Sequence, residues 1–362
     1  MQTLFRYLCY LLSSNQAAFS IRQRRMTRIP YDRMVFICSS IFCVSNEKVF
    51  SKKNLIESIN MAISHSEASS NFSTDELVQS AMTKARSRWA SKGLDADTCA
   101  RLESRLSELA ATPIGRFILV NGGLNGYWTN YLAGIGCDFI QNKTKPRTFA
   151  NDTEEYIVAA SAEMRGEHEL LLRKIIGPIL KPGCVVASVP CGLMSEILLA
   201  ADHFDGVKLY AIDIDKGNFD LIREKYGDRL VGNEFHPLEM NALTLEFDCT
   251  FDLITCLGFV MYLKEESFPN FFSRIYRALK PGGRLLLSFY PEASEHSTLI
   301  PFDATRMEAV DREFRMCTEV RYTTRPPTSS MLRYFSQAGF VRISIHGGSY
   351  YLLPLIEAYK QE

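Results

Sequence analysis

Small residues and a proline follow a short apolar run, where the chain reads Val185-Val-Ala-Ser-Val-Pro-Cys-Gly192. A turn of this kind lets the backbone approach a ligand closely, and the helix that follows presents free N–H groups to anionic atoms such as a carboxylate. The turn formed by Ser188, Pro190, Cys191 and Gly192 is therefore a candidate ligand-binding loop.

A carboxylate ends the next apolar run, Leu209-Tyr-Ala-Ile-Asp-Ile-Asp215. At the end of a buried parallel strand, a carboxylate can accept hydrogen bonds from both hydroxyls of a ribose. Asp213 lies about twenty-five residues beyond the start of the loop, near the spacing used for dinucleotides. Alternatively, Asp213 only caps the turn between the strand and the following helix. Asp213 by itself does not favour the ribose interpretation over the cap interpretation.

The elements that must position these residues alternate regularly from Asn151 onward. Buried parallel strands appear as short apolar runs, and helices between them imply right-handed crossovers and a doubly wound α/β sheet. Predicted helices include one from Asn151 or Asp152 to Ile176, Ser195–Phe204 and Ser267–Leu279; predicted strands are Val185–Val189, Leu209–Ile212, Phe251–Cys256 and Arg284–Tyr290. The last two apolar runs, Phe340–Ile345 and Tyr351–Tyr359, follow each other directly and predict a C-terminal antiparallel hairpin.

The chain before this alternation divides into two further regions. Residues 51–150 are predicted to be a helical accessory region, with a helix start at Asp75 and a glycine-containing turn between helices in the segment that follows Gly115. Residues 1–50 are an extension of unknown role. Its apolar stretches are about ten residues long, short of the roughly twenty that span a bilayer. Its arginines, with no acidic residue before Asp32, are typical of a transit peptide or a membrane-surface segment, or of a poorly packed extension.

Composition narrows the function classes. Basic and acidic residues balance at 41 each, which argues against nucleic acid as the main partner. The ten cysteines are scattered, without a C-x-x-C pair, so the sequence predicts neither a metal site nor a disulfide framework. Cysteines inside apolar runs fit a reducing, cytoplasmic compartment.

Taken in order, these pieces resemble the class I S-adenosylmethionine-dependent methyltransferases. The similarity covers roughly residues 155–360. It is carried by Val185–Gly192, Tyr210-Ala-Ile-Asp-Ile-Asp215, Met240-Asn-Ala242, Phe251-Asp-Leu-Ile-Thr-Cys-Leu-Gly258, Leu279-Lys-Pro-Gly-Gly-Arg-Leu-Leu-Leu287 and Gln337-Ala-Gly-Phe340.

The resemblance implies a seven-stranded sheet that binds S-adenosylmethionine. It places Asp213 on the ribose with Ile214 next to it, Asn241 and Ala242 beside the adenine, Leu257 and Gly258 near the sulfonium, and the first loop around the methionine end.

The first loop departs from the family pattern. An acidic residue is usual where Ser188 stands and a glycine where Pro190 stands, so the cofactor's ammonium group needs another contact, from the preceding helix or the N-terminal region. Arg165 in the preceding helix is a candidate for the methionine carboxylate, because a guanidinium fork matches that anion. The alternative is that Arg165 is a solvated arginine on a helix face.

Methyl transfer from a sulfonium is a direct displacement, so a catalytic base is optional. His296 is the candidate base, with Glu292 as second choice, and both are also explained as surface loop residues. Tyr262 is a candidate pocket residue that can instead pack under the following helix.

The expected acceptor is a small molecule, with an apolar or lipid-like compound as one option. The N-terminal helices, with Tyr127, Trp128 and Tyr131, and the insertion at 292–327 are expected to select it, although these aromatics can equally form an interface with the sheet. Two other functions remain open. One is a catalytically impaired S-adenosylmethionine-binding protein. The other is a nicotinamide-dependent reductase, although the absence of a G-x-G-x-x-G loop after the first strand argues against it.

Overall fold

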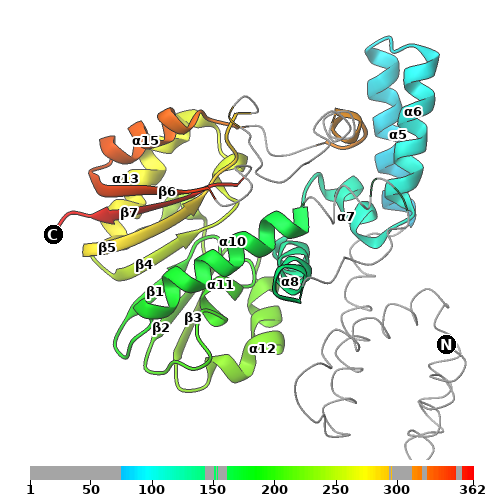
Figure 1. Ribbon diagram of the computed structural model, residues 1–362. Helices are drawn as coiled ribbons and strands as arrows, with labels where there is room; N and C mark the ends of the chain where they lie inside the picture. Colours follow the sequence, from blue (N-terminus) through cyan, green and yellow to red (C-terminus); the bar gives the residue numbers. More distant parts are fainter. Residues whose placement is uncertain are drawn as a thin grey trace, which may run out of the picture. The chain divides into compact units, whose positions relative to one another are not determined.

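The computed structural model describes residues 75–142, 151, 153, 161–292, 295, 312–319, 324–347 and 353–362 (Figure 1). Residues Asp75–Glu362 form one compact unit. The predictions for residues 1–50, for residues 51–74 of the accessory region and for a helix start at Asp152 lie outside the described residues. Within those residues, no helix is long and apolar enough to cross a membrane.

A seven-stranded sheet forms the centre of this unit, in the order β3-β2-β1-β4-β5-β7-β6. The first five strands are parallel, whereas β7 runs antiparallel to both β5 and β6. The predicted α/β sheet with a C-terminal antiparallel hairpin is thus confirmed. The strands are β1 (Val185–Ser188), β2 (Lys208–Asp213), β3 (Glu234–Glu239), β4 (Phe251–Cys256), β5 (Leu279–Ser288), β6 (Phe340–His346) and β7 (Leu355–Lys360).

Helices cover both faces of the sheet, because successive side chains of each buried strand point to opposite faces. On one face, Val186 of β1 packs in a core cluster with Ile176 and Ile222. On the other face, Ala187 packs in a cluster with Phe272 and Phe335. Figure 1 shows the two helical layers, formed by α10 (Ser161–Ile176), α11 (Ser195–Leu198) and α12 (Gly217–Leu230) on one side and α13 (Phe268–Ala278) and α15 (Thr328–Gln337) on the other.

Several predicted boundaries are wrong, and two of them differ most from the structure. The helix after the first loop ends at Leu198 and does not reach Phe204. The chain turns at residues 199 and 200, where the Ala200 carbonyl oxygen would lie 2.7 Å from a Cβ placed on Gly177. Strand β5 begins at Leu279, earlier than predicted, because Leu279 pairs with Phe251 ahead of an irregularity in the ladder.

Among the described residues, the helices that precede the α/β region are α5 (Asp75–Ser91), α6 (Ala96–Ala110), α7 (Pro113–Asn121) and α8 (Gly126–Asn142). Leu102, Leu106 and Leu109 of α6 are fully buried in a hydrophobic core that α6 shares with α5, α7 and α8. The predicted glycine turn lies between α7 and α8. Gly115, however, belongs to α7, where a Cβ would lie 2.2 Å from the carbonyl oxygen of Leu109, so that glycine allows α6 and α7 to touch.

Candidate functional site

The loop after β1 is held by backbone hydrogen bonds to the two neighbouring strands. The Val189 N–H donates to the Thr255 carbonyl at 2.8 Å, and the Cys191 N–H donates to the Ile212 carbonyl at 2.9 Å. The peptide bond between Val189 and Pro190 is cis, and Gly192 has a φ of 48°, a left-handed conformation that favours glycine. The loop is therefore fixed at the carboxyl ends of β1, β2 and β4.

Asp213 at the end of β2 meets this loop directly. Its carboxylate accepts hydrogen bonds from the Gly192 N–H at 3.1 Å, the Asp215 N–H at 3.0 Å and the Asn218 amide at 3.1 Å. The side chain is only 6% exposed. Asp213 thus organises the strand-to-helix turn and also faces the candidate loop. Its role toward a ribose stays a prediction. Asn218 was not predicted; its only signal is an amide in the first turn of the helix after the acidic strand end.

The residue that follows this buried carboxylate has an apolar side chain exposed to solvent. Ile214 is 70% exposed, although isoleucine is among the residue types most often buried. The backbone N–H of Met240 donates to the Asp213 carbonyl at 2.9 Å, which brings the next turn alongside. In that turn Asn241 caps the short helix η3 (Ala242–Thr244) through a 2.9 Å bond to the Leu243 N–H, while Ala242 is buried.

The turn after β4 forms a third part of the site. Leu257 is half-buried, and Gly258 has a φ of 61° with its N–H donating to the Ser288 hydroxyl at 2.8 Å. Tyr262 in η4 (Val260–Tyr262) is 39% exposed. Its hydroxyl would lie 3.3 Å from a Cβ placed on Gly123, so Tyr262 faces the turn between α7 and α8. His296 lies outside the described residues, and Glu292 is exposed.

A buried carboxylate that the sequence did not reveal lies beside the same loop. Glu196, in the first turn of α11, is 4% exposed. One of its oxygens accepts hydrogen bonds from the Ser188 hydroxyl at 2.7 Å and the Thr255 hydroxyl at 2.8 Å. A carboxylate is thus present at the end of β1 although Ser188 replaces the acidic residue of the family pattern. The signal that could have found it is an acidic residue inside the stretch 193–201, which is otherwise apolar apart from Ser195.

Helix α8 closes on the loop through a contact between two glycines. A Cβ on Gly126, the first residue of α8, would lie 2.7 Å from the Cα of Gly192. Further along the helix, a Cβ on Gly166 of α10 would lie 2.2 Å from the backbone of Gly136. These contacts leave no room for side chains, so the N-terminal helical region is a structural part of the candidate site.

Arg165 is half-buried on α10. Burial, and secondly the positive charge of Arg165, lowers the pKa of His168 to about 4. The role of Arg165 toward a carboxylate stays a prediction.

The aromatic residues of α8 are packed among themselves. Trp128 is 6% exposed and contacts Tyr127 and Tyr131 edge-on, with ring centroids 5.2 and 5.5 Å apart. Burial raises the pKa of Tyr127 to about 12. Trp128 belongs to the same core as Val78 and Trp89 of α5 and Leu102 of α6, and this core contains no strand residue. The described contacts thus place Trp128 within the helical region, and they show neither a pocket wall nor an interface with the sheet.

The insertion after β5 docks on the N-terminal helices. Residues 312–317 are helical, and Arg105 of α6 forms an ion pair with Glu313 at 2.9 Å. The Trp89 indole donates to the Met316 carbonyl at 2.8 Å. The two regions expected to select the acceptor are thus joined to each other.

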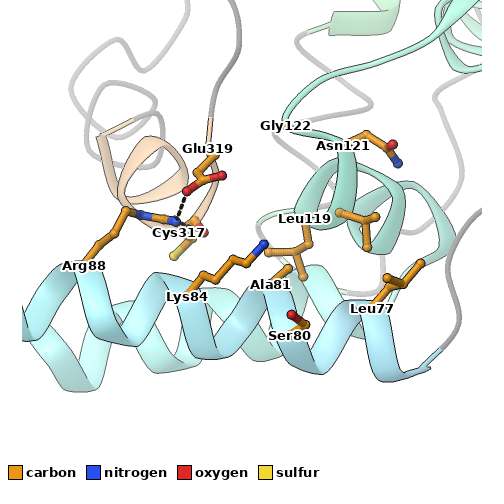
Figure 2. Close-up of a pocket in the computed structure, with 11 residues that line it drawn as sticks. Leu77, Ser80, Ala81, Lys84, Arg88, Leu119, Asn121, Gly122, Cys317 and Glu319 are labelled. Carbon is orange, nitrogen blue, oxygen red and sulfur yellow. Dashed lines mark hydrogen bonds and ion pairs between the residues drawn. The ribbon is translucent and has the colours of Figure 1, made fainter.

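A hollow of about 110 Å³ lies between α5, α7 and this docked segment. Figure 2 shows Lys84 and Arg88 on α5, with Arg88 paired to Glu319 at 2.9 Å. Its lining residues come from α5, the end of α7, Cys317 and Glu319, and none belongs to the sheet. The hollow is therefore separate from the loop after β1.

Comparison with known proteins identifies the domain. Residues 186–283 match the model of a family described as a methyltransferase domain. A crystal structure of a possible exported protein from Bordetella parapertussis is similar over 79% of this chain and 96% of its own, with 25% identity and a TM-score of 0.66.

Curated relatives match shorter parts of the chain. Phosphoethanolamine N-methyltransferase of Triticum aestivum is 30% identical over 111 residues, which is 31% of this chain and 21% of the relative. The 18S rRNA (guanine-N(7))-methyltransferase of Bos taurus is 31% identical over 153 residues, 37% of this chain and 51% of the relative. The chain thus spans between about a fifth and a half of the length of these relatives. With the strand order and the loops above, the matches show that this chain carries a class I, Rossmann-like S-adenosylmethionine-dependent methyltransferase domain.

Proposed function

We propose that the protein binds S-adenosylmethionine at the ends of β1, β2 and β4 and transfers its methyl group to a small-molecule acceptor. The observation that carries the proposal is the 3.1 Å hydrogen bond between the Gly192 N–H and the Asp213 carboxylate, which joins the candidate loop to the candidate ribose acid. The two features were predicted separately from the sequence, and a shared ligand at this edge is what their contact supports.

The residues at this edge fit the cofactor. The exposed side chain of Ile214 offers an apolar surface to an adenine ring, and Asp213 next to it offers a carboxylate to a ribose diol. Asn241 and Ala242 would flank the base, and Leu257 and Gly258 would lie near the sulfur. When bound, S-adenosylmethionine supplies an electrophilic methyl group on its sulfonium.

The chain's own contribution to the reaction is alignment and exclusion of water. Helix α8, which touches the loop at Gly126, would cover the methionyl end. Tyr262 is the described side chain best placed to contact an acceptor, because it is partly exposed beside Gly123. His296 and Arg165 keep the roles of acceptor base and carboxylate ligand as proposals.

A small acceptor is favoured over RNA by the charge of the chain. The names of relatives include both classes, with phosphoethanolamine for one and 18S rRNA for another. Binding to RNA rests on an excess of Lys and Arg that neutralises phosphates, whereas here 41 basic residues are matched by 41 acidic ones.

Calorimetric titration of the full chain with S-adenosylmethionine, S-adenosylhomocysteine and NADH tests the proposal. We expect both sulfur nucleosides to bind and NADH to give no saturable heat. Saturable binding of NADH with no response to either sulfur nucleoside would favour the reductase instead. Turnover is then followed with radiolabelled methyl donor over acceptors that range from polar to apolar. Cofactor binding without transfer to any of them would favour the catalytically impaired protein.

A further inference from the structure

Glu196 is a buried carboxylate for which the described part of the chain provides hydrogen bonds but no ion pair. It is 4% exposed and accepts bonds from Ser188 and Thr255. None of the ion pairs among the described residues includes Glu196, whereas the nearby Glu169 is paired with Arg173 at 2.9 Å. A buried charge without a counter-charge is costly, and such groups concentrate at functional sites.

In the part of the chain that the structure describes, no positively charged group acts on the Glu196 carboxylate. Glu169 of α10 is the charged neighbour that acts on it, Tyr226 lies on the side of α12, and Cys191 lies on the side of the loop. Burial, and secondly the negative charge of Glu169, raises the pKa of Glu196 to about 7, while the bonds from Ser188 and Thr255 act in the opposite direction. Ionised Glu196 is therefore an unfavourable state of this structure that a cation would relieve.

The hydroxyls that hold Glu196 belong to the strands that carry the proposed cofactor site. Ser188 is the last residue of β1, directly before the loop, and Thr255 pairs with it from β4, two residues before Leu257. Their hydroxyls are 3.0 Å apart. The carboxylate thus lies against the backbone from which the loop and the turn after β4 both begin.

We propose that Glu196 is a positioning residue whose carboxylate provides the counter-charge for the ammonium group at the methionyl end of the cofactor. In this chain the negative charge comes from Glu196 of α11, the helix that follows the loop. The Ser188 hydroxyl donates to this carboxylate, so the Ser188 oxygen can accept a hydrogen bond from the ammonium group. The inference rests on the proposed function, because it assumes that the loop holds the methionyl end.

A comparison of two nucleosides separates this role from general support of the loop. S-adenosylhomocysteine carries the ammonium group, and methylthioadenosine has the same adenosine and a thioether but no amino-acid end. Glu196→Gln keeps the shape and an oxygen acceptor and removes the charge. We expect the variant to bind S-adenosylhomocysteine about tenfold more weakly at pH 8, or about 1.4 kcal/mol, and methylthioadenosine with a change below about twofold.

Stability of the ligand-free protein gives a second readout. Removal of an uncompensated buried charge should raise the thermal midpoint of Glu196→Gln above wild type at pH 8, although the variant binds the cofactor more weakly. The double variant Ser188→Asp with Glu196→Gln returns a carboxylate to the end of β1, within reach of the glutamine amide. It should recover most of the lost affinity for S-adenosylhomocysteine. Glu266→Gln, on the exposed helix η5 (Glu265–Ser267), is the matched control and should change none of these values.

Each other outcome has a distinct meaning. An equal loss of affinity for both nucleosides would show that Glu196 only supports the loop. Unchanged affinity for both would show that the charge of Glu196 does not contribute to binding. Either result overturns the inference. Failure of the wild-type protein to bind S-adenosylhomocysteine at all would overturn the proposed function as well.

Discussion

Replacement of Asp213 by asparagine should weaken cofactor binding strongly while the protein still folds. The change removes one charge and one acceptor oxygen and keeps the shape of the side chain. Asp213 accepts three N–H bonds, two of them on one oxygen from Gly192 and Asn218 and the third on the other from Asp215. An asparagine can direct its oxygen to the first pair and leave only the Asp215 N–H without its acceptor, at a cost of about 1 to 3 kcal/mol in stability.

The loss in affinity follows from the charge. A hydrogen bond to an ionised acceptor contributes about 1.5 to 3 kcal/mol, which corresponds to a dissociation constant raised about 10- to 150-fold. At a ligand concentration about 1,000 times the wild-type dissociation constant, S-adenosylhomocysteine should stabilise the wild-type protein by about 4.1 kcal/mol. A variant weakened about 100-fold should gain only about 1.4 kcal/mol under the same conditions.

Calorimetric titration and thermal unfolding with and without S-adenosylhomocysteine measure both quantities. Asp220→Asn is the control, because Asp220 is exposed on α12 and its pair with Arg223 is a surface pair that contributes little. Unchanged affinity in a folded Asp213→Asn protein would refute the assignment of the ribose to this carboxylate.

Three further predictions test other parts of the site. Gly126→Ala should lower affinity for S-adenosylhomocysteine and destabilise the protein, because its Cβ would lie 2.7 Å from Gly192, whereas Gly134→Ala on the same helix meets nothing within 4 Å and should be neutral or slightly stabilising. Ile214→Ser should weaken binding by roughly fivefold through lost apolar contact, with an unchanged thermal midpoint because the side chain is already 70% exposed. The pKa of Glu196 is raised from 4.5 to about 7 in the folded protein, so between these pH values the folded state binds more protons than the unfolded state. The contribution of Glu196 to stability is therefore fully present below pH 4.5 and is lost as the pH rises through 7. Thermal unfolding of wild type and Glu196→Gln across this range should show the difference between them growing in favour of the variant, and parallel curves would contradict it.

Much of the architecture could be predicted from the sequence because buried parallel strands appear as continuous apolar runs. Strand β3 could not be found this way. It lies at the edge of the sheet, carries Pro237 and is half-exposed, so it shows neither an apolar run nor a clear alternation. The early start of β5 was missed because Lys280-Pro-Gly-Gly283 has the composition of a turn, although Leu279 pairs with β4.

Parts of the candidate site could be predicted where a single residue at a strand end indicates them. Parts that depend on contacts between distant segments could not. The loop and Asp213 follow from the order of strand ends, and the structure brings them together as expected. The approach of Gly126 to Gly192 joins residues far apart in the sequence and cannot be read from either glycine alone. Glu196 was missed because an acidic residue within an apolar segment can indicate a buried carboxylate, but it does not indicate which strand end that carboxylate will reach.

A crystal structure of the full chain with S-adenosylhomocysteine tests the central claim most directly. The ribose hydroxyls should lie within hydrogen-bond distance of the Asp213 carboxylate, with the adenine against Ile214 and the amino-acid end against the loop at Gly192. Ligand bound elsewhere, such as in the hollow between α5 and α7, with the Asp213 carboxylate still enclosed by Gly192 and Asn218, would contradict the account.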